Sequence, residues 1–70
     1  MPDLNERLKS LRTDRNLAQV DVAKYCNISE RSLKYYESGE RVPDANVIIK
    51  FCDYFDVSAD YLLGRSDSTN

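Results

Sequence analysis

The sequence predicts an all-α fold, a compact bundle of five helices, and three observations support this prediction. The chain has 70 residues, which is enough for one domain with a thin hydrophobic core. It contains only two glycines and two prolines, too few for the many turns of a β fold. Its apolar residues recur at helical spacings, which is typical of helices that bury one face. Residues 1–65 should form the domain, and the polar residues 66–70 a disordered tail.

The first helix is expected at residues 4–15. Its apolar stripe consists of Leu4, Leu8 and Leu11, which repeat at intervals of four and three residues. Asp3 can cap this helix, and Glu6 completes the spacing of a capping box. The other faces should carry the basic residues Arg7, Lys9, Arg12 and Arg15.

Two short helices follow, at residues 19–26 and 29–37, joined by a turn at Asn27 and Ile28. Ala18 precedes the first of them and offers no side-chain oxygen to the free amides, which should cost about 1 kcal/mol. Ser29 is a good cap for the second, and Gly39 stands where a helix end favours glycine. The residues expected to face the core are Val22, Ala23, Cys26, Ile28, Leu33 and Tyr36.

A fourth helix is expected at residues 45–55, capped by Asp44, and a short fifth at residues 59–63, capped by Ser58. Asp56 turns the chain between them, and Gly64 ends the last helix. The inward residues of the fourth helix should be Val47, Ile48, Phe51, Cys52 and Phe55. Cys26 and Cys52 are expected to be small, reduced core residues, because two thiols without histidine cannot build the usual zinc site.

The segment of residues 19–38 is the most informative part of the chain. Its two short helices are separated by a turn too short for antiparallel packing, so they must cross steeply. Ala23 provides the small side chain that such a close crossing needs. The third helix should then present four side chains outward together, those of Glu30, Arg31, Lys34 and Tyr35.

Four blocks of sequence resemble the phage-repressor and Cro-like (Xre) helix-turn-helix family. They are LKSLR in the first helix, LAQVDVAKYCNIS across the turn, YYESGERVPD after the third helix, and FCDYFDVSADYLLG near the end. At the family's spacings they cover roughly residues 4–65. The resemblance implies a lambda-repressor-like DNA-binding domain, in which the second and third helices form the helix-turn-helix and the third enters the major groove.

The resemblance also implies which residues meet DNA. Gln19, which opens the second helix, should contact DNA, and Arg12 and Glu37 should form a partly buried ion pair. Arg41, in the loop after the third helix, is a candidate contact to the DNA backbone. The recognition positions correspond to Ser29, Glu30, Arg31, Ser32, Lys34 and Tyr35.

The chemistry of these side chains suits most of the implied roles. Arg31 can form two hydrogen bonds with guanine O6 and N7, and Lys34 can reach a base or a phosphate. Ser29 and Ser32, with the amides of the helix N-terminus, suit phosphate oxygens. Tyr35 can donate to a phosphate or pack on a thymine methyl group. On the residues alone, however, charged side chains here could also form an ordinary solvated face.

Three residues depart from the family's pattern. Ala18 replaces the usual serine or threonine, and Asn27 replaces a common glycine. Glu30 is the largest departure, because a carboxylate in the groove repels phosphate unless it accepts a hydrogen bond from cytosine or orients Arg31. The net charge of −2 is also unusual for a nucleic-acid binder, although residues 1–41 hold eight basic and seven acidic side chains.

The leading interpretation is a sequence-specific DNA-binding transcriptional regulator, expected to be a repressor. One such domain makes few phosphate contacts, so we expect a homodimer that binds half-sites about 34 Å apart. The candidates for the dimer contact are apolar and aromatic residues near the end of the chain, which could instead close the core: Val57, Tyr61, Leu62 and Leu63.

The alternative is a protein-interaction module, such as an antitoxin-like or anti-repressor partner, with weakened DNA binding. Glu30 and the acidic pI of about 4.9 favour it. An enzyme is not expected, because the chain has no histidine, no glycine-rich phosphate loop and no nucleophile beside a base. The sequence suggests no cofactor, metal, small-molecule site or membrane span, and we expect a cytoplasmic protein of bacterial or phage origin.

Overall fold

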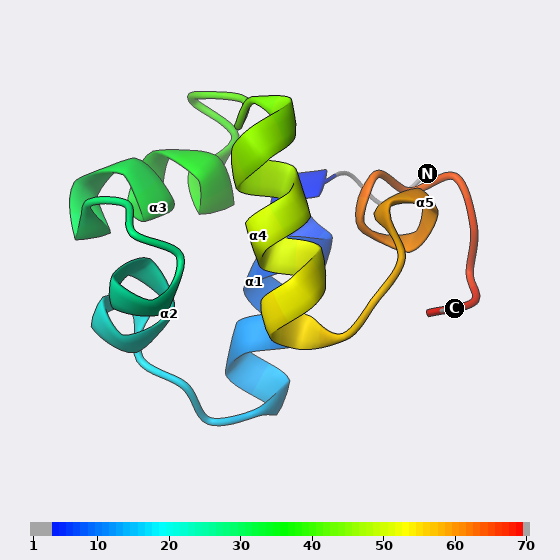
Figure 1. The fold of residues 1–70 in the computed structure, drawn as a ribbon, viewed down its shortest axis with the longest axis horizontal. Coiled ribbons are helices and arrows are strands. Elements are labelled where there is room, and N and C mark those ends of the chain that lie inside the picture. Colours follow the sequence, from blue (N-terminus) through cyan, green and yellow to red (C-terminus); the bar gives the residue numbers. More distant parts are fainter. Residues whose placement is uncertain (1–3, 70) are drawn as a thin grey trace.

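The computed structural model describes residues 4–69, which contain five helices and no strand (Figure 1). The helices are α1 (Leu4–Asp14), α2 (Gln19–Tyr25), α3 (Glu30–Ser38), α4 (Ala45–Phe55) and α5 (Ala59–Leu62). The all-α prediction and the order of its elements are therefore confirmed. None of these helices combines the length and apolar character that a membrane crossing requires.

The helix boundaries follow from capping side chains and left-handed residues. Ser29, Asp44 and Ser58 each accept a hydrogen bond from the backbone N–H three residues later, as predicted for α3, α4 and α5. Asn27 has φ of 56° and Gly39 has φ of 84°, so both take the left-handed conformation that ends a helix. The predicted ends of four helices, α1, α2, α3 and α5, differ from the structure by one residue, and the Asp3 cap lies outside the described residues.

Every helix contributes buried residues to the hydrophobic core. Figure 1 shows α2 and α3 at one side of α4, and α5 at the other. The buried apolar residues are Leu8, Leu11, Val22, Ala23, Cys26, Leu33, Tyr36, Phe51, Phe55, Val57 and Leu62. Val47, Ile48 and Cys52, predicted to face inward, are half-buried and pack against this core, as do Leu4 and Ile28. The crossing of α2 and α3 buries Ala23 as the sequence predicts.

Both cysteine thiols are at least half-buried, which disfavours a role as nucleophiles. Cys26 is fully buried, Cys52 is half-buried, and neither forms a disulfide. Burial raises the pKa of both thiols above the ordinary value, because it disfavours the thiolate. Both cysteines should therefore remain protonated and weakly nucleophilic, as core residues.

Arg7 is placed differently from the sequence-based expectation. It was expected on an outer face of α1, but only 8% of it is exposed, and its guanidinium lies 4.3 Å from the ring centroid of Tyr61. The same group donates hydrogen bonds to the carbonyls of Tyr61 and Ser66 and to the carboxylate of Asp67. Residues 66–69, predicted to be a disordered tail, thus lie against α1 and α5 as far as the structure describes them.

The uncapped start of α2 leads to a prediction about stability. Ala18 has the backbone conformation of an N-cap, φ −79° and ψ 153°, but no side-chain oxygen to accept a hydrogen bond. Ala18→Ser should therefore raise the free energy of unfolding by about 1 kcal/mol, measured by urea denaturation. Ser29→Ala is the matched control and should lower it by about the same amount, since Ser29 caps the next helix. No stabilisation by Ala18→Ser would mean that the start of α2 is satisfied in another way.

Candidate nucleic-acid interface

Helix α3 is anchored by one face and exposes the other. Leu33, Tyr36 and Glu37 are buried, whereas Arg31 and Lys34 are exposed. This division follows from the helical period, because residues three and four apart share a face. In Figure 1 the helix lies along one edge of the molecule.

The first turn of α3 carries two linked serines. Ser29 Oγ accepts a hydrogen bond from the Ser32 backbone N–H, and it donates to Ser32 Oγ at 2.9 Å. Both residues therefore stand where the sequence predicts them, at the helix N-terminus. Their hydroxyls are next to the positive end of the helix dipole, which favours an anion such as phosphate.

Arg31, Tyr35 and Arg41 form a second cluster on the exposed side. Arg31 Nε donates to the Tyr35 hydroxyl at 3.1 Å, and its guanidinium carbon lies 5.5 Å from the centre of the Tyr35 ring. The Arg41 guanidinium carbon lies 6.0 Å from the same ring centre. The ring therefore brings a helix arginine and a loop arginine together, and both arginine side chains are exposed.

Glu30 interacts with lysine instead of arginine. Its carboxylate lies 3.9 Å from Lys34 Nζ, one turn away, and the two side chains are 48% and 59% exposed. Such an exposed pair contributes little to stability, so either partner is free to exchange it for a nucleic-acid contact. The pair partly neutralises Lys34, whereas the Arg31 guanidinium contacts Tyr35.

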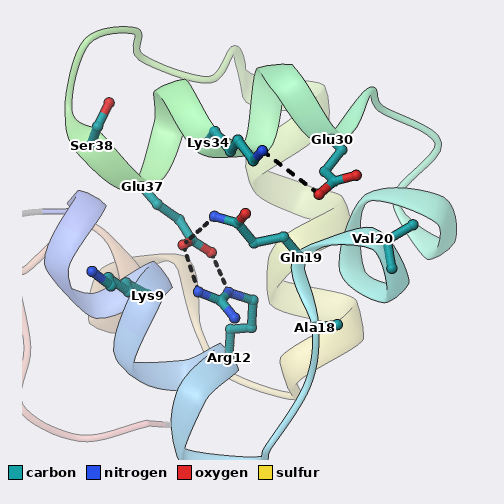
Figure 2. A pocket seen from close by; sticks show the side chains of 9 residues that line it. All are labelled: Lys9, Arg12, Ala18, Gln19, Val20, Glu30, Lys34, Glu37 and Ser38. Carbon is teal, nitrogen blue, oxygen red and sulfur yellow. Dashed lines mark hydrogen bonds and ion pairs between the residues drawn. The ribbon is translucent and has the colours of Figure 1, made fainter.

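Below α3, a partly buried hydrogen-bond network holds Gln19 (Figure 2). Arg12 donates two hydrogen bonds to the Glu37 carboxylate, at 2.6 and 3.0 Å, and a third to the Leu17 carbonyl. The ion pair that the resemblance implies is thus present, and the hydrogen bond to Glu37 raises the pKa of the Arg12 guanidinium. Gln19 Nε2 donates to the same carboxylate at 3.1 Å. The amide nitrogen of Gln19 therefore faces the ion pair.

An open hollow of about 470 Å³ lies between α1, the start of α2 and α3. Figure 2 shows its lining, which is Lys9, Arg12, Ala18, Gln19, Val20, Glu30, Lys34, Glu37 and Ser38. Of the charged residues in this lining, Lys9 is the one that sequence reasoning did not select, because its place on α1 gives no sign of proximity to α3. The hollow adds an exposed cation to the same side of the molecule as Lys34.

The residues proposed for a dimer contact divide into two groups. Val57 and Leu62 are 8% and 0% exposed and belong to the core, so they are not available for a subunit contact. Tyr61 is half-buried beneath the guanidinium of Arg7, and Leu63 is 37% exposed. Leu63 also lines a shallow hollow with Leu4, Asn5, Tyr36, Gly39, Arg41 and Val42.

Known proteins share both the sequence pattern and the fold. A family model described as helix-turn-helix matches residues 8–62. The chain is 36% identical to the HTH-type transcriptional regulator ImmR of Bacillus subtilis, over 91% of this chain and 50% of ImmR. It is 39% identical to the cryptic phage CTXphi transcriptional repressor RstR of Vibrio cholerae, over 89% of this chain and 55% of RstR. The chain thus spans about half the length of these relatives.

The solved structures include a close match to the whole fold. The P22 c2 repressor, crystallised in complex with a synthetic operator, superposes with a TM-score of 0.88. The match covers 94% of this chain and 100% of that chain, at 21% sequence identity. It confirms the predicted five-helix, lambda-repressor-like fold.

Proposed function

The chain belongs to the helix-turn-helix family of phage-repressor and Cro-like (Xre) regulators, and on this premise we propose that it is a sequence-specific double-stranded DNA-binding transcriptional regulator that acts as a repressor. The observation that carries the proposal is the exposed face of α3, held in place by the burial of Leu33 and Tyr36 on the opposite face. In this proposal the domain has no catalytic activity and works in the bacterial cytoplasm.

The proposed contacts divide into those that read bases and those that position the domain. Arg31 lies in the first turn of α3 and would form two hydrogen bonds with guanine in the major groove. Ser29, Ser32 and Arg41 would bind phosphates at either end of the helix. The other proposed DNA contacts are Gln19, Glu30, Lys34 and Tyr35. Lys9 joins this set because it borders the same hollow as Gln19 and Lys34.

A homodimer would supply the phosphate contacts that one domain lacks. The two α3 helices would enter successive major grooves about 34 Å apart, and the operator would be an inverted repeat. Because Val57 and Leu62 are buried in the core, Leu63 is the remaining exposed candidate for the subunit contact. Segments beyond this domain in a longer protein could equally hold the dimer together.

The second candidate function is a protein-interaction module with weakened DNA binding. The ion pair between Glu30 and Lys34 favours it, because the carboxylate partly neutralises one cation on the α3 surface. The two candidates differ in their response to salt. Counterion release makes DNA affinity fall steeply as salt rises, and the slope reports the number of phosphates contacted.

The experiment that tests the proposed function is selection of binding sites from a random DNA pool, followed by affinity measurements over a salt series. We expect an enriched inverted repeat and an affinity that falls linearly with salt on logarithmic axes. Arg31→Ala should weaken binding to that site by about 1–3 kcal/mol and relax the preference at one base pair per half-site. The control, Arg65→Ala, removes the same charge from an exposed position outside α3 and should leave the preference unchanged. A pool without enrichment would favour the interaction module.

A further inference from the structure

We propose that Tyr35 is a positioning residue, whose hydroxyl orients the Arg31 guanidinium for base recognition. The inference rests on the proposed function and adds to it a second residue that sets specificity. Tyr35 would act through Arg31, in addition to any direct contact of its own with DNA.

The geometry that carries the inference is the contact between neighbouring turns of α3. Arg31 Nε donates to the Tyr35 hydroxyl oxygen at 3.1 Å, and the guanidinium carbon lies 5.5 Å from the ring centre. Residues four apart on a helix are neighbours on its surface, so this contact follows the helical period. A hydrogen bond and a ring contact together restrict the rotation of a long, exposed side chain.

Tyr35 is itself held better than the arginine it contacts. Its side chain is half-buried, and its carbonyl accepts hydrogen bonds from the Arg41 N–H at 3.3 Å and from Ser38 Oγ at 3.1 Å. These bonds tie the end of α3 to the loop that carries Arg41. The backbone of Tyr35 is therefore held in place, and its ring contacts both arginines.

The contact selects which nitrogens of Arg31 remain for DNA. With Nε directed to Tyr35, the pair Nη1 and Nη2 is left to face a base edge and can bind guanine O6 and N7 end-on. Glu30, the nearest acid in the sequence, pairs with Lys34. The orienting role that the sequence allowed for Glu30 is thus taken by Tyr35.

The inference is tested by a double-mutant cycle with Arg31→Ala and Tyr35→Phe, measured on the selected site and on a site changed at the Arg31 base pair. Tyr35→Phe keeps the ring and removes the hydroxyl. Alone, it should weaken binding to the selected site about three- to tenfold and reduce discrimination between the two sites. In the Arg31→Ala background it should have no further effect, because the residue it orients is gone.

The control and the structural readout separate this role from others. Tyr25→Phe removes a hydroxyl from an exposed tyrosine that packs on Tyr54, outside α3, and should change neither affinity nor discrimination. In the DNA-free protein, Tyr35→Phe should shift the NMR signal of the Arg31 Nε proton. Additive losses in the cycle, equal on both sites, would show a direct phosphate contact and overturn the inference while leaving the proposed function intact. If the wild-type chain selects no site, the proposed function fails and the inference falls with it.

Discussion

Replacing Glu37 with leucine should lower the free energy of unfolding by about 3–5 kcal/mol, measured by urea denaturation. The Glu37 side chain is 4% exposed and neutralises Arg12, whose side chain is 13% exposed. Without the carboxylate, a mostly buried guanidinium keeps, among residues 4–69, only the Leu17 carbonyl as a hydrogen-bond partner. A domain of this size has a free energy of unfolding of roughly 4–10 kcal/mol, so the substitution should remove a large share of it.

Two comparisons make this prediction specific to the pair. The double variant Arg12→Met with Glu37→Leu should recover most of the lost stability, because an apolar pair leaves no buried charge. Glu40→Gln, which changes an exposed acid two residues beyond α3, should change stability by less than about 0.5 kcal/mol. If Glu37→Leu were as harmless as Glu40→Gln, the Arg12–Glu37 pair would not be structurally important.

Phe51→Ala should destabilise the domain by about 3–5 kcal/mol and lower the midpoint of thermal unfolding. Phe51 is fully buried, and its ring meets Tyr36 of α3 edge-to-face, with 6.2 Å between the centroids. Removing the ring opens a cavity between α4 and the helix proposed to enter DNA. Thermal unfolding followed by circular dichroism measures the effect.

The control for Phe51→Ala lies on the same helix. Ile49→Ala changes a residue that is 58% exposed and should alter stability by less than about 1 kcal/mol. Similar losses from the two substitutions would show that α4 does not pack as described. A Phe51→Leu variant should retain part of the stability, since leucine refills part of the cavity.

The helices and their caps could be predicted because each depends on nearby residues. Ser29 accepts from an N–H three residues away, and Gly39 ends a helix by its own backbone freedom. The core stripes are equally local, because helical periodicity places Leu8 and Leu11 on one face. A resemblance over residues 4–65 then provided the arrangement of the helices and the Arg12–Glu37 pair.

The features that sequence reasoning missed depend on residues far apart in the chain. Arg7 was expected on an outer face, but it is buried by Tyr61 and Ser66, which lie more than 50 positions away. Lys9 borders the hollow beside Lys34 only because α1 packs against α3. Val57 and Leu62 could not be assigned to the core or to a subunit contact from an apolar pattern, since both locations favour the same residues.

Recognition of DNA by the exposed face of α3 can be followed residue by residue when the ¹⁵N-labelled chain is titrated with the selected DNA and the backbone amide signals are recorded. The largest shifts should fall on residues 29–35, with smaller ones at Gln19 and Arg41. Shifts concentrated instead around Tyr25 and Tyr54, with α3 unaffected, would contradict it.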